Sequence, residues 1–224
     1  MGRAPRPLAG NVIYHVINRA NGRMTLFRKD ADYQAFEQIL AQAVERYSMR
    51  LFAYCIMPNH WHLILYPHEG KDLSNFMQWL TLTHTRRWHA HYHTNGYGHA
   101  YQGRFKSFPV EMDNYFMQLC RYVERNPLRA KLVSKAEDWQ WSSLWRRVYG
   151  TSDQQALLSP WPITPDNNYL QLVNKEEPED ELKVIRNSVN RGAPYGSSTW
   201  LADVVSKFRL GSTLKPRGRP KKGT

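Results

Sequence analysis

The sequence predicts an α+β protein built around a four-stranded antiparallel sheet, arranged as in ferredoxin-like and RRM-like folds. Four short segments are rich in β-branched and aromatic residues, and two longer segments between them carry apolar residues at helical spacing. Their order along the chain is strand, helix, strand, strand, helix, strand. Sheets of that order usually carry both helices on one face and leave the other face open.

The strands are predicted from runs bounded by turn-forming residues. Asn18-Arg19-Ala20-Asn21-Gly22-Arg23 closes the first one, and Pro58-Asn59 separates the second from the third. Pro109 restricts the fourth to an edge or an end of the sheet, because proline lacks the N–H that a central strand needs. The predicted strands are 11–17, 50–57, 60–66 and 104–110.

The helices are predicted from apolar residues that recur every three or four positions. Asp30 is the expected N-cap of the first helix, which ends near Ser48, and Asp72 or Ser74 is expected to cap the second. The second helix runs into the segment 89–93, which holds three histidines. A spacing of two does not align side chains on a helix, so a solvated helix end or loop is preferred there over a metal site.

Composition favours a nucleic-acid partner. Lys and Arg exceed Asp and Glu by 31 to 19, giving a net charge of +12, and the 224 residues include 8 Trp and 13 Tyr. Positive charge combined with aromatic rings suits a polyanion with exposed bases. The lack of a long apolar run, and of any disulfide framework beyond Cys55 and Cys120, predicts a soluble, cytoplasmic, nucleoid-associated protein without a membrane partner.

The third strand carries two histidines, His60 and His62, that are expected to project from the same face. The apolar residues that alternate with them point to the opposite face. Two imidazoles can hold a divalent metal but rarely suffice alone, so a third ligand and a reacting group are needed elsewhere. The alternative is that two polar residues merely begin a strand.

A later helix, predicted over 114–126, supplies candidates for both roles. Gln118, Tyr122 and Asn126 are four residues apart and share a face. If this helix packs beside the open sheet face, Asn126 offers its amide oxygen as third ligand and Tyr122 stands one turn away as nucleophile. Tyr115 is the competing tyrosine, but the leucine one turn after it cannot bind a metal. Alternatively, Tyr122 is a core residue and Asn126 ends the helix before a proline.

Several motifs resemble those of one family. His60-Trp61-His62 resembles the HUH motif, in which U is a bulky apolar residue. Tyr122-Val-Glu-Arg-Asn-Pro-Leu-Arg-Ala130 resembles the tyrosine-helix signature of single-tyrosine HUH transposases. Segments 14–19, 98–107 and 139–143 are similar to segments of the REP-associated tyrosine transposases, a branch of that family. The resemblance covers about residues 8–150.

The resemblance implies an RRM-like sheet and a site in which His60, His62 and Asn126 bind Mg²⁺ or Mn²⁺. The better-known insertion-sequence relatives carry Gln at the position of Asn126. It also implies that Tyr122 cleaves single-stranded DNA and leaves a 5′-phosphotyrosine and a free 3′-hydroxyl. REP-associated members act on palindromic hairpins, so hairpin DNA of palindromic repeats is the expected partner, bound by a monomer or a homodimer.

Basic and polar residues near these motifs are predicted to contact DNA phosphates, although each charge is equally compatible with a solvated surface. Two of them lie among prolines at the N-terminus, and the others lie in or beside the predicted sheet and tyrosine helix. They are Arg3, Arg6, Asn18, Arg19, Arg104, Lys106, Arg125 and Arg129.

The composition changes beyond Gly150, which suggests three parts: residues 1–150, which hold the motifs that resemble the transposases, a helical extension at 151–212 and a basic tail at 213–224. Two short helices, 179–190 and 199–209, are expected to pack on the main domain, since their spacer is long for a helix-turn-helix. The tail resembles an AT-hook, in which Arg-Gly-Arg-Pro lies in the narrow minor groove of an AT-rich duplex. Its candidate contacts are Lys215, Arg217, Gly218, Arg219 and Lys221.

Two other classes fit parts of the pattern. A non-catalytic RRM-like module would stack nucleic-acid bases on aromatic residues without a metal, and the aligned histidines together with Tyr122 argue against it. A zinc hydrolase is disfavoured because no carboxylate, histidine or cysteine offers a convincing third ligand.

Overall fold

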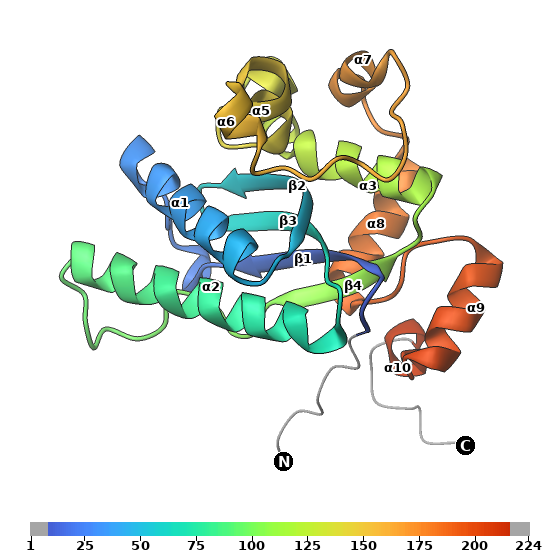
Figure 1. Ribbon diagram of the computed structural model, residues 1–224, viewed down its shortest axis with the longest axis horizontal. Helices are drawn as coiled ribbons and strands as arrows, with labels where there is room; N and C mark the ends of the chain where they lie inside the picture. The colour runs from blue at the N-terminus through green and yellow to red at the C-terminus, as the bar shows by residue number, and fades with distance from the viewer. Residues whose placement is uncertain (1–8, 216–224) are drawn as a thin grey trace, which may run out of the picture.

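The fold is centred on a four-stranded antiparallel sheet, as predicted (Figure 1). The computed structural model describes residues 9–215. The strands lie side by side in the order β2-β3-β1-β4, so that β4 forms an edge and accommodates Pro109 there. They are β1 (Ile13–Arg19), β2 (Arg50–Met57), β3 (His60–Tyr66) and β4 (Lys106–Val110).

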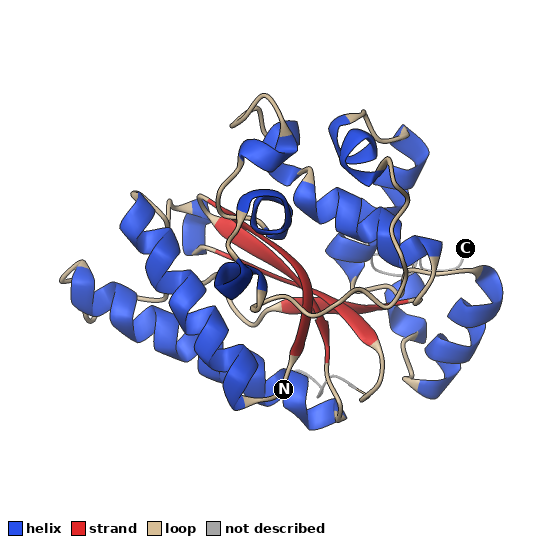
Figure 2. Ribbon diagram, turned by 45° about the horizontal axis from the view of Figure 1, so that its top comes forward, coloured by secondary structure: helices blue, strands red, loops and turns tan. Residues whose placement is uncertain are grey.

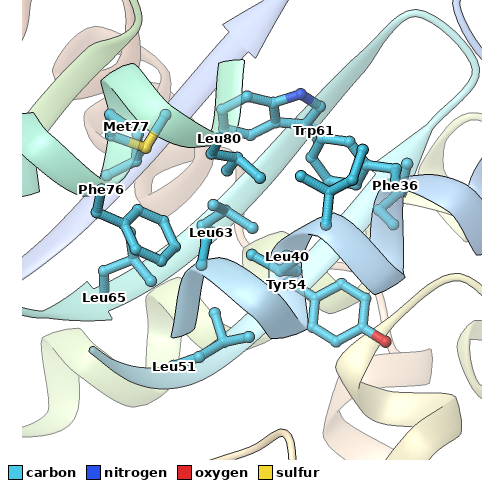
Figure 3. Packing of buried hydrophobic residues seen from close by; sticks show 14 of the residues in the cluster. Phe36, Leu40, Leu51, Tyr54, Trp61, Leu63, Leu65, Phe76, Met77 and Leu80 are labelled. Carbon is cyan, nitrogen blue, oxygen red and sulfur yellow. The ribbon is translucent and has the colours of Figure 1, made fainter. Parts of the chain in front are cut away.

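Two long helices, α1 (Asp30–Arg46) and α2 (Gly70–His91), cover one face of the sheet. Trp61 of β3 is fully buried in this layer, where its ring packs against Phe36 of α1 with centroids 5.6 Å apart. Figure 3 shows these rings in the same layer as Leu80 of α2. Each buried side chain of this size stabilises the fold by about 1.5–3 kcal/mol, so this layer is the main hydrophobic core.

Several element ends differ from the prediction by a few residues. α1 begins after Lys29 rather than after Asp30, because Asp32, at the third helical position, accepts a hydrogen bond from the Lys29 N–H at 3.2 Å. Asp72 accepts in the same way from the N–H of Glu69 at 2.8 Å, so α2 also starts earlier than expected. β1 and β4 each begin two residues later than predicted, and α2 continues through most of the histidine-rich segment.

The second face of the sheet, beside which the tyrosine helix was expected to pack, is covered by that helix and also by the C-terminal extension. Helices lie on both sides of the strands (Figure 2). The helices on this second side are α3 (Asn114–Glu124), α4 (Asn126–Arg129) and α8 (Glu179–Arg191). α5 (Ser143–Tyr149) begins at the outer edge of β2, where Ser143 Oγ accepts from Tyr54 N and donates to Tyr54 O. Phe52 and Phe108 of the sheet are buried here together with Ile185 of α8. The C-terminal extension therefore shares a core with the sheet.

The predicted helical pair of the extension is present as α8 and α9 (Ser198–Lys207). Gly192, with φ at +72°, ends α8 in the left-handed conformation. The chain then returns to the outer edge of β4, where Tyr195 N donates to Pro109 O and Tyr195 O accepts from Glu111 N, on either side of Val110. The remaining elements are short: α6 (Ser152–Gln155), α7 (Tyr169–Asn174), α10 (Gly211–Leu214), and the 3₁₀ helices Asn21–Arg23 and Ala136–Asp138. Within residues 9–215, none of the helices combines the length and apolar character needed to cross a bilayer.

Candidate active site

The two histidines of β3 lie on the sheet face that α3 and α8 cover. His60 pairs with Arg19 across the ladder to β1, and His62 pairs with Ile17. The two imidazole rings are 5.1 Å apart between centroids, because residues two apart on a strand share a face. Trp61 between them belongs to the core on the other face. This part of the predicted geometry is therefore present.

Both imidazoles are held neutral and oriented. Burial lowers the pKa of His60 to about 4, helped by the nearby positive charge of Arg19. Burial also lowers the pKa of His62 far below its usual value, and His15 and His60 add to that effect. His60 Nδ1 donates to Asn59 Oδ1 at 2.7 Å, and His62 Nδ1 lies 2.8 Å from His15 Nε2. A neutral histidine with Nδ1 occupied has Nε2 left for a metal.

Tyr122 of α3 lies directly against this pair. Its ring meets the His62 ring edge to face, with centroids 6.0 Å apart. The tyrosine is 8% exposed, and burial raises the pKa of its hydroxyl, while the positive charges of Arg129, Arg186 and Arg19 oppose that rise. Packing of α3 on β2 and β3 thus brings together side chains that are about sixty residues apart in the sequence.

Asn126 does not continue the tyrosine helix as expected. α3 ends at Glu124, and Asn126 begins α4, in which Pro127 occupies the first turn. The interruption follows from proline, which has no N–H to donate to the preceding turn. Asn126 is half-buried, and its carbonyl oxygen accepts from Ala130 N at 2.9 Å. Its role as third ligand stays a prediction.

The available donors suit an oxygen-preferring divalent ion that accepts some nitrogen ligands. In the described part of the chain no group of three or more His, Cys, Asp and Glu side chains is arranged to hold a metal. Two neutral imidazoles therefore need a ligand of another kind, and the amide of Asn126, four residues after Tyr122, is the predicted one. Mg²⁺ and Mn²⁺ both accept such an oxygen and keep open positions for substrate.

Arg19 and Lys106 surround the site with positive charge. Arg19 ends β1 opposite His60, and its Nε is buried with no hydrogen-bond partner among residues 9–215. Lys106 begins β4 opposite Ile17, so it shares the sheet face of the histidines and is exposed. Arg19 therefore carries one N–H without an acceptor among the described residues, and its contact to DNA stays a prediction.

Arg125 and Arg129 instead contact the C-terminal extension. Arg129 Nη2 lies 2.7 Å from Glu177 Oε2, and Arg125 Nε lies 3.5 Å from the same oxygen. Arg125 Nη1 also donates to the carbonyl oxygens of Val173 and Asn174 at 3.0 and 2.9 Å. Arg125 is only 8% exposed, and these bonds join it to the extension. Its phosphate contact stays a prediction.

Two residues of the site escaped the sequence reasoning. Glu177 lies in an acidic run that resembles a solvated linker, yet it is buried between two arginines. His15 sits in the apolar β1 and contacts His62. Its position two residues from Ile17, on the face of the histidines, was the signal that could have revealed it.

Asn18 and Arg104, two further predicted DNA contacts, line a groove of about 740 Å³ beside α2. The backbone N–H of Gln102, which lines this groove, donates to Arg19 O at 2.9 Å. Because Arg19 ends β1 opposite His60, the groove lies at the same end of the sheet as the histidines. The groove has no carboxylate in its lining, which consists of Asn18, Ser74, Met77, Gln78, Thr81, Leu82, Thr85, His99, Ala100, Tyr101, Gln102, Gly103, Arg104 and Phe105.

The predicted contacts at the two ends of the chain are mostly not described by the structure. Lys215 follows α10 and is exposed. The others lie outside the described residues; they are Arg3, Arg6, Arg217, Gly218, Arg219 and Lys221.

The histidine pair on β3 and the tyrosine that α3 presents to it are the arrangement that the resemblance to single-tyrosine transposases implied. The family model described as "Transposase IS200 like" matches residues 9–126, from the approach to β1 as far as Asn126. The chain belongs to this family. No curated protein matches the chain significantly.

The fold is similar to that in a solved structure of the REP-associated tyrosine transposase bound to a REP hairpin. The TM-score is 0.54 at 19% sequence identity, and the match covers 74% of this chain and 93% of that chain. A second solved structure, of a protein from Deinococcus radiodurans assigned as a transposase, matches with a TM-score of 0.39 at 19% identity, covering 55% of this chain and 96% of that chain. At 19% identity the likeness to the first structure bears on the fold alone.

Proposed function

We propose that this transposase cleaves and rejoins single-stranded DNA with Tyr122 as the nucleophile. The observation that carries the proposal is the contact between Tyr122 and His62, whose rings meet edge to face at 6.0 Å beside His60. A phenol placed against two neutral imidazoles is the arrangement that metal-assisted transesterification needs. Tyr115, in contrast, packs its ring on Tyr195 with centroids 5.0 Å apart.

His60, His62 and Asn126 would hold a divalent ion, Mg²⁺ or Mn²⁺. Bound there, the ion would supply positive charge to a non-bridging phosphate oxygen and to the leaving oxygen. The low pKa values of both histidines keep the imidazoles unprotonated at neutral pH, which ligation requires.

The chain's own residues then account for the transfer. The Tyr122 oxygen loses its proton to water and attacks phosphorus, the bond from phosphorus to the 3′ oxygen breaks, and that oxygen takes up a proton as a 3′-hydroxyl. Arg19, which lies opposite His60 across the β1–β3 ladder, would supply positive charge to the phosphate during this step. The 5′-phosphotyrosine keeps the energy of the broken bond, so attack by a 3′-hydroxyl reverses the reaction without ATP.

Hairpin DNA of palindromic repeats is the proposed substrate. The motif resemblance to REP-associated transposases and the fold shared with one that was solved on a REP hairpin support this choice. The carboxylate-free groove beside Asn18 and Arg104, with Lys106 nearby, offers a path for an unpaired strand past the sheet edge. The tail beyond residue 212 would add a minor-groove contact to AT-rich duplex, and residues 151–212 would brace the catalytic face.

A non-catalytic RRM-like module is the second candidate function. Such modules use aromatic residues on a free sheet face to stack bases. In this chain Phe52 and Phe108 on that face are buried beneath α3 and α8, which favours the catalytic proposal.

The test is covalent trapping. Strands that carry a REP-type hairpin and a 3′-end label are incubated with Mn²⁺ or Mg²⁺, and a denaturing gel reports labelled protein. We expect an adduct with wild-type protein and with Tyr115→Phe, and none with Tyr122→Phe or with His60→Ala. An adduct that still forms in Tyr122→Phe would refute the assignment of the nucleophile. If the wild-type protein forms no adduct with either metal on varied hairpins, the proposed nuclease activity is refuted.

A further inference from the structure

We propose that His15 is a positioning residue that keeps the proton of His62 on Nδ1 and so aims the Nε2 lone pair of His62 at the metal. The inference rests on the proposed function, because it concerns the same metal ligand. His15 contacts neither the tyrosine nor the substrate path in the described structure; it acts through His62.

His15 is placed for this role by the sheet itself. It lies on β1 two residues before Ile17, the cross-strand partner of His62, and therefore on the same face. Its Nε2 is 2.8 Å from His62 Nδ1, and the two rings stack at 29° with centroids 5.0 Å apart. Phe108 of β4 packs on its other side at 4.8 Å, and His15 is 0% exposed. The ring is therefore clamped between two neighbouring strands.

Only one arrangement of protons is compatible with metal ligation by His62. If His15 donated to His62 Nδ1, the proton of neutral His62 would sit on Nε2, and that nitrogen would have no lone pair to offer. If His62 Nδ1 donates to His15 Nε2, His62 Nε2 is free to ligate. His60 is set in the same way, because its Nδ1 faces Asn59 Oδ1, which can only accept.

This arrangement leaves one N–H of His15 buried without an acceptor in the described part of the chain, which packing alone does not explain. With Nε2 accepting, the proton of His15 sits on Nδ1, and this atom is buried without a hydrogen-bond partner among residues 9–215. An apolar side chain would fill the space between His62 and Phe108 without that unpaired group. The hydrogen bond that His15 Nε2 accepts from His62 explains why an imidazole occupies this position.

The first test reads the tautomer of His62 directly. The full-length protein with ¹⁵N-labelled histidines is recorded by NMR without metal, with His62→Gln as the assignment control. We expect the pattern of a neutral imidazole protonated at Nδ1 for His62. A neutral His62 protonated at Nε2 would overturn the proposal, whether or not the protein cleaves DNA.

The second test measures Mn²⁺ binding to the full-length protein without DNA, by electron paramagnetic resonance of the free ion. His15→Leu removes the acceptor, and His15→Gln retains an amide oxygen in its place. We expect about 10- to 100-fold weaker binding for His15→Leu and recovery of most of the affinity in His15→Gln. His84→Gln changes a buried histidine elsewhere and should leave Mn²⁺ affinity unchanged.

The outcomes separate the two proposals. Wild-type affinity in a folded His15→Leu protein would overturn the positioning role while leaving the nuclease intact. No Mn²⁺ binding by the wild type, or Mn²⁺ binding that His60→Ala does not weaken, would instead refute the metal site. If His15→Leu fails to fold, the tautomer of wild-type His62 and the affinity of His15→Gln still decide the question.

Discussion

Arg129 contacts Tyr122 in two ways. Its guanidinium carbon lies 4.5 Å from the centre of the phenol ring, and its Nη2 donates to the Tyr122 carbonyl oxygen at 3.1 Å. The same guanidinium is paired with Glu177 of the extension. Arg129 of α4 thus holds Tyr122 of α3 in place. Through its pair with Glu177, it also ties Tyr122 to a segment more than fifty residues further along the chain.

We expect Arg129→Lys to slow adduct formation by about tenfold, because an ammonium cannot stack on the ring and bond to both partners at once. Single-turnover cleavage of labelled hairpin DNA measures this rate. Arg186→Lys is the matched control, since Arg186 influences the charge near Tyr122 but pairs with Glu179 on the surface. Equal rates in the two variants would show that ring contact by Arg129 is unimportant.

Glu177→Gln should destabilise the fold by about 3 kcal/mol, because it leaves two partly buried arginines without their carboxylate. Urea unfolding, followed by tryptophan fluorescence, measures the free energy of unfolding. Glu179→Gln removes an ion pair in which both side chains are well exposed, so its expected loss is at most about 1 kcal/mol. A loss for Glu177→Gln no larger than that of Glu179→Gln would contradict the structural role of the buried pair.

The groove beside α2 provides a test of the DNA path. Gln78→Glu places a carboxylate in its lining, and we expect about fivefold weaker binding of hairpins that carry an unpaired flank, or ~1 kcal/mol. Asn75→Glu adds the same charge to the same helix outside the groove. Fluorescence anisotropy at two salt concentrations measures both variants. Equal losses would indicate a general charge effect in place of a strand path.

The buried side chain of His84 should lower the free energy of unfolding in acid. It is 3% exposed, and burial lowers its pKa to about 3, whereas an unfolded histidine titrates near 6.5. Between these values the unfolded chain binds more protons than the folded one, so stability falls as the pH drops below about 6.5. From pH 7 to pH 5 this histidine alone removes about 2 kcal/mol of the free energy of unfolding.

The comparison of urea unfolding at pH 7 and pH 5 measures that loss. His84→Gln should shrink the difference between the two pH values by about 2 kcal/mol, even though it lowers stability at pH 7. His99→Gln, at an exposed position, should leave the difference as it is. An unchanged pH dependence in His84→Gln would show that His84 is not the group responsible.

Local patterns were enough for much of the fold. The alternation of residues 60–66 predicted a strand with apolar residues on one face and histidines on the other, and both are present. Helical spacing predicted α1, α2 and α3, and the two short helices expected in the extension are present as α8 and α9. Exact ends were harder, because the acidic residues that start α1 and α2 act from the third helical position, where they reach back to the backbone.

The amino-acid sequence by itself determined which groups are available for chemistry, since strand and helix periods place His60, His62 and Tyr122 on defined faces. The tertiary structure decided what those groups meet. The clamp of His15 on His62, the burial of Glu177 between arginines and the covering of the second sheet face all join segments far apart in the chain. Such contacts depend on how whole elements pack, and no local spacing of residues encodes them.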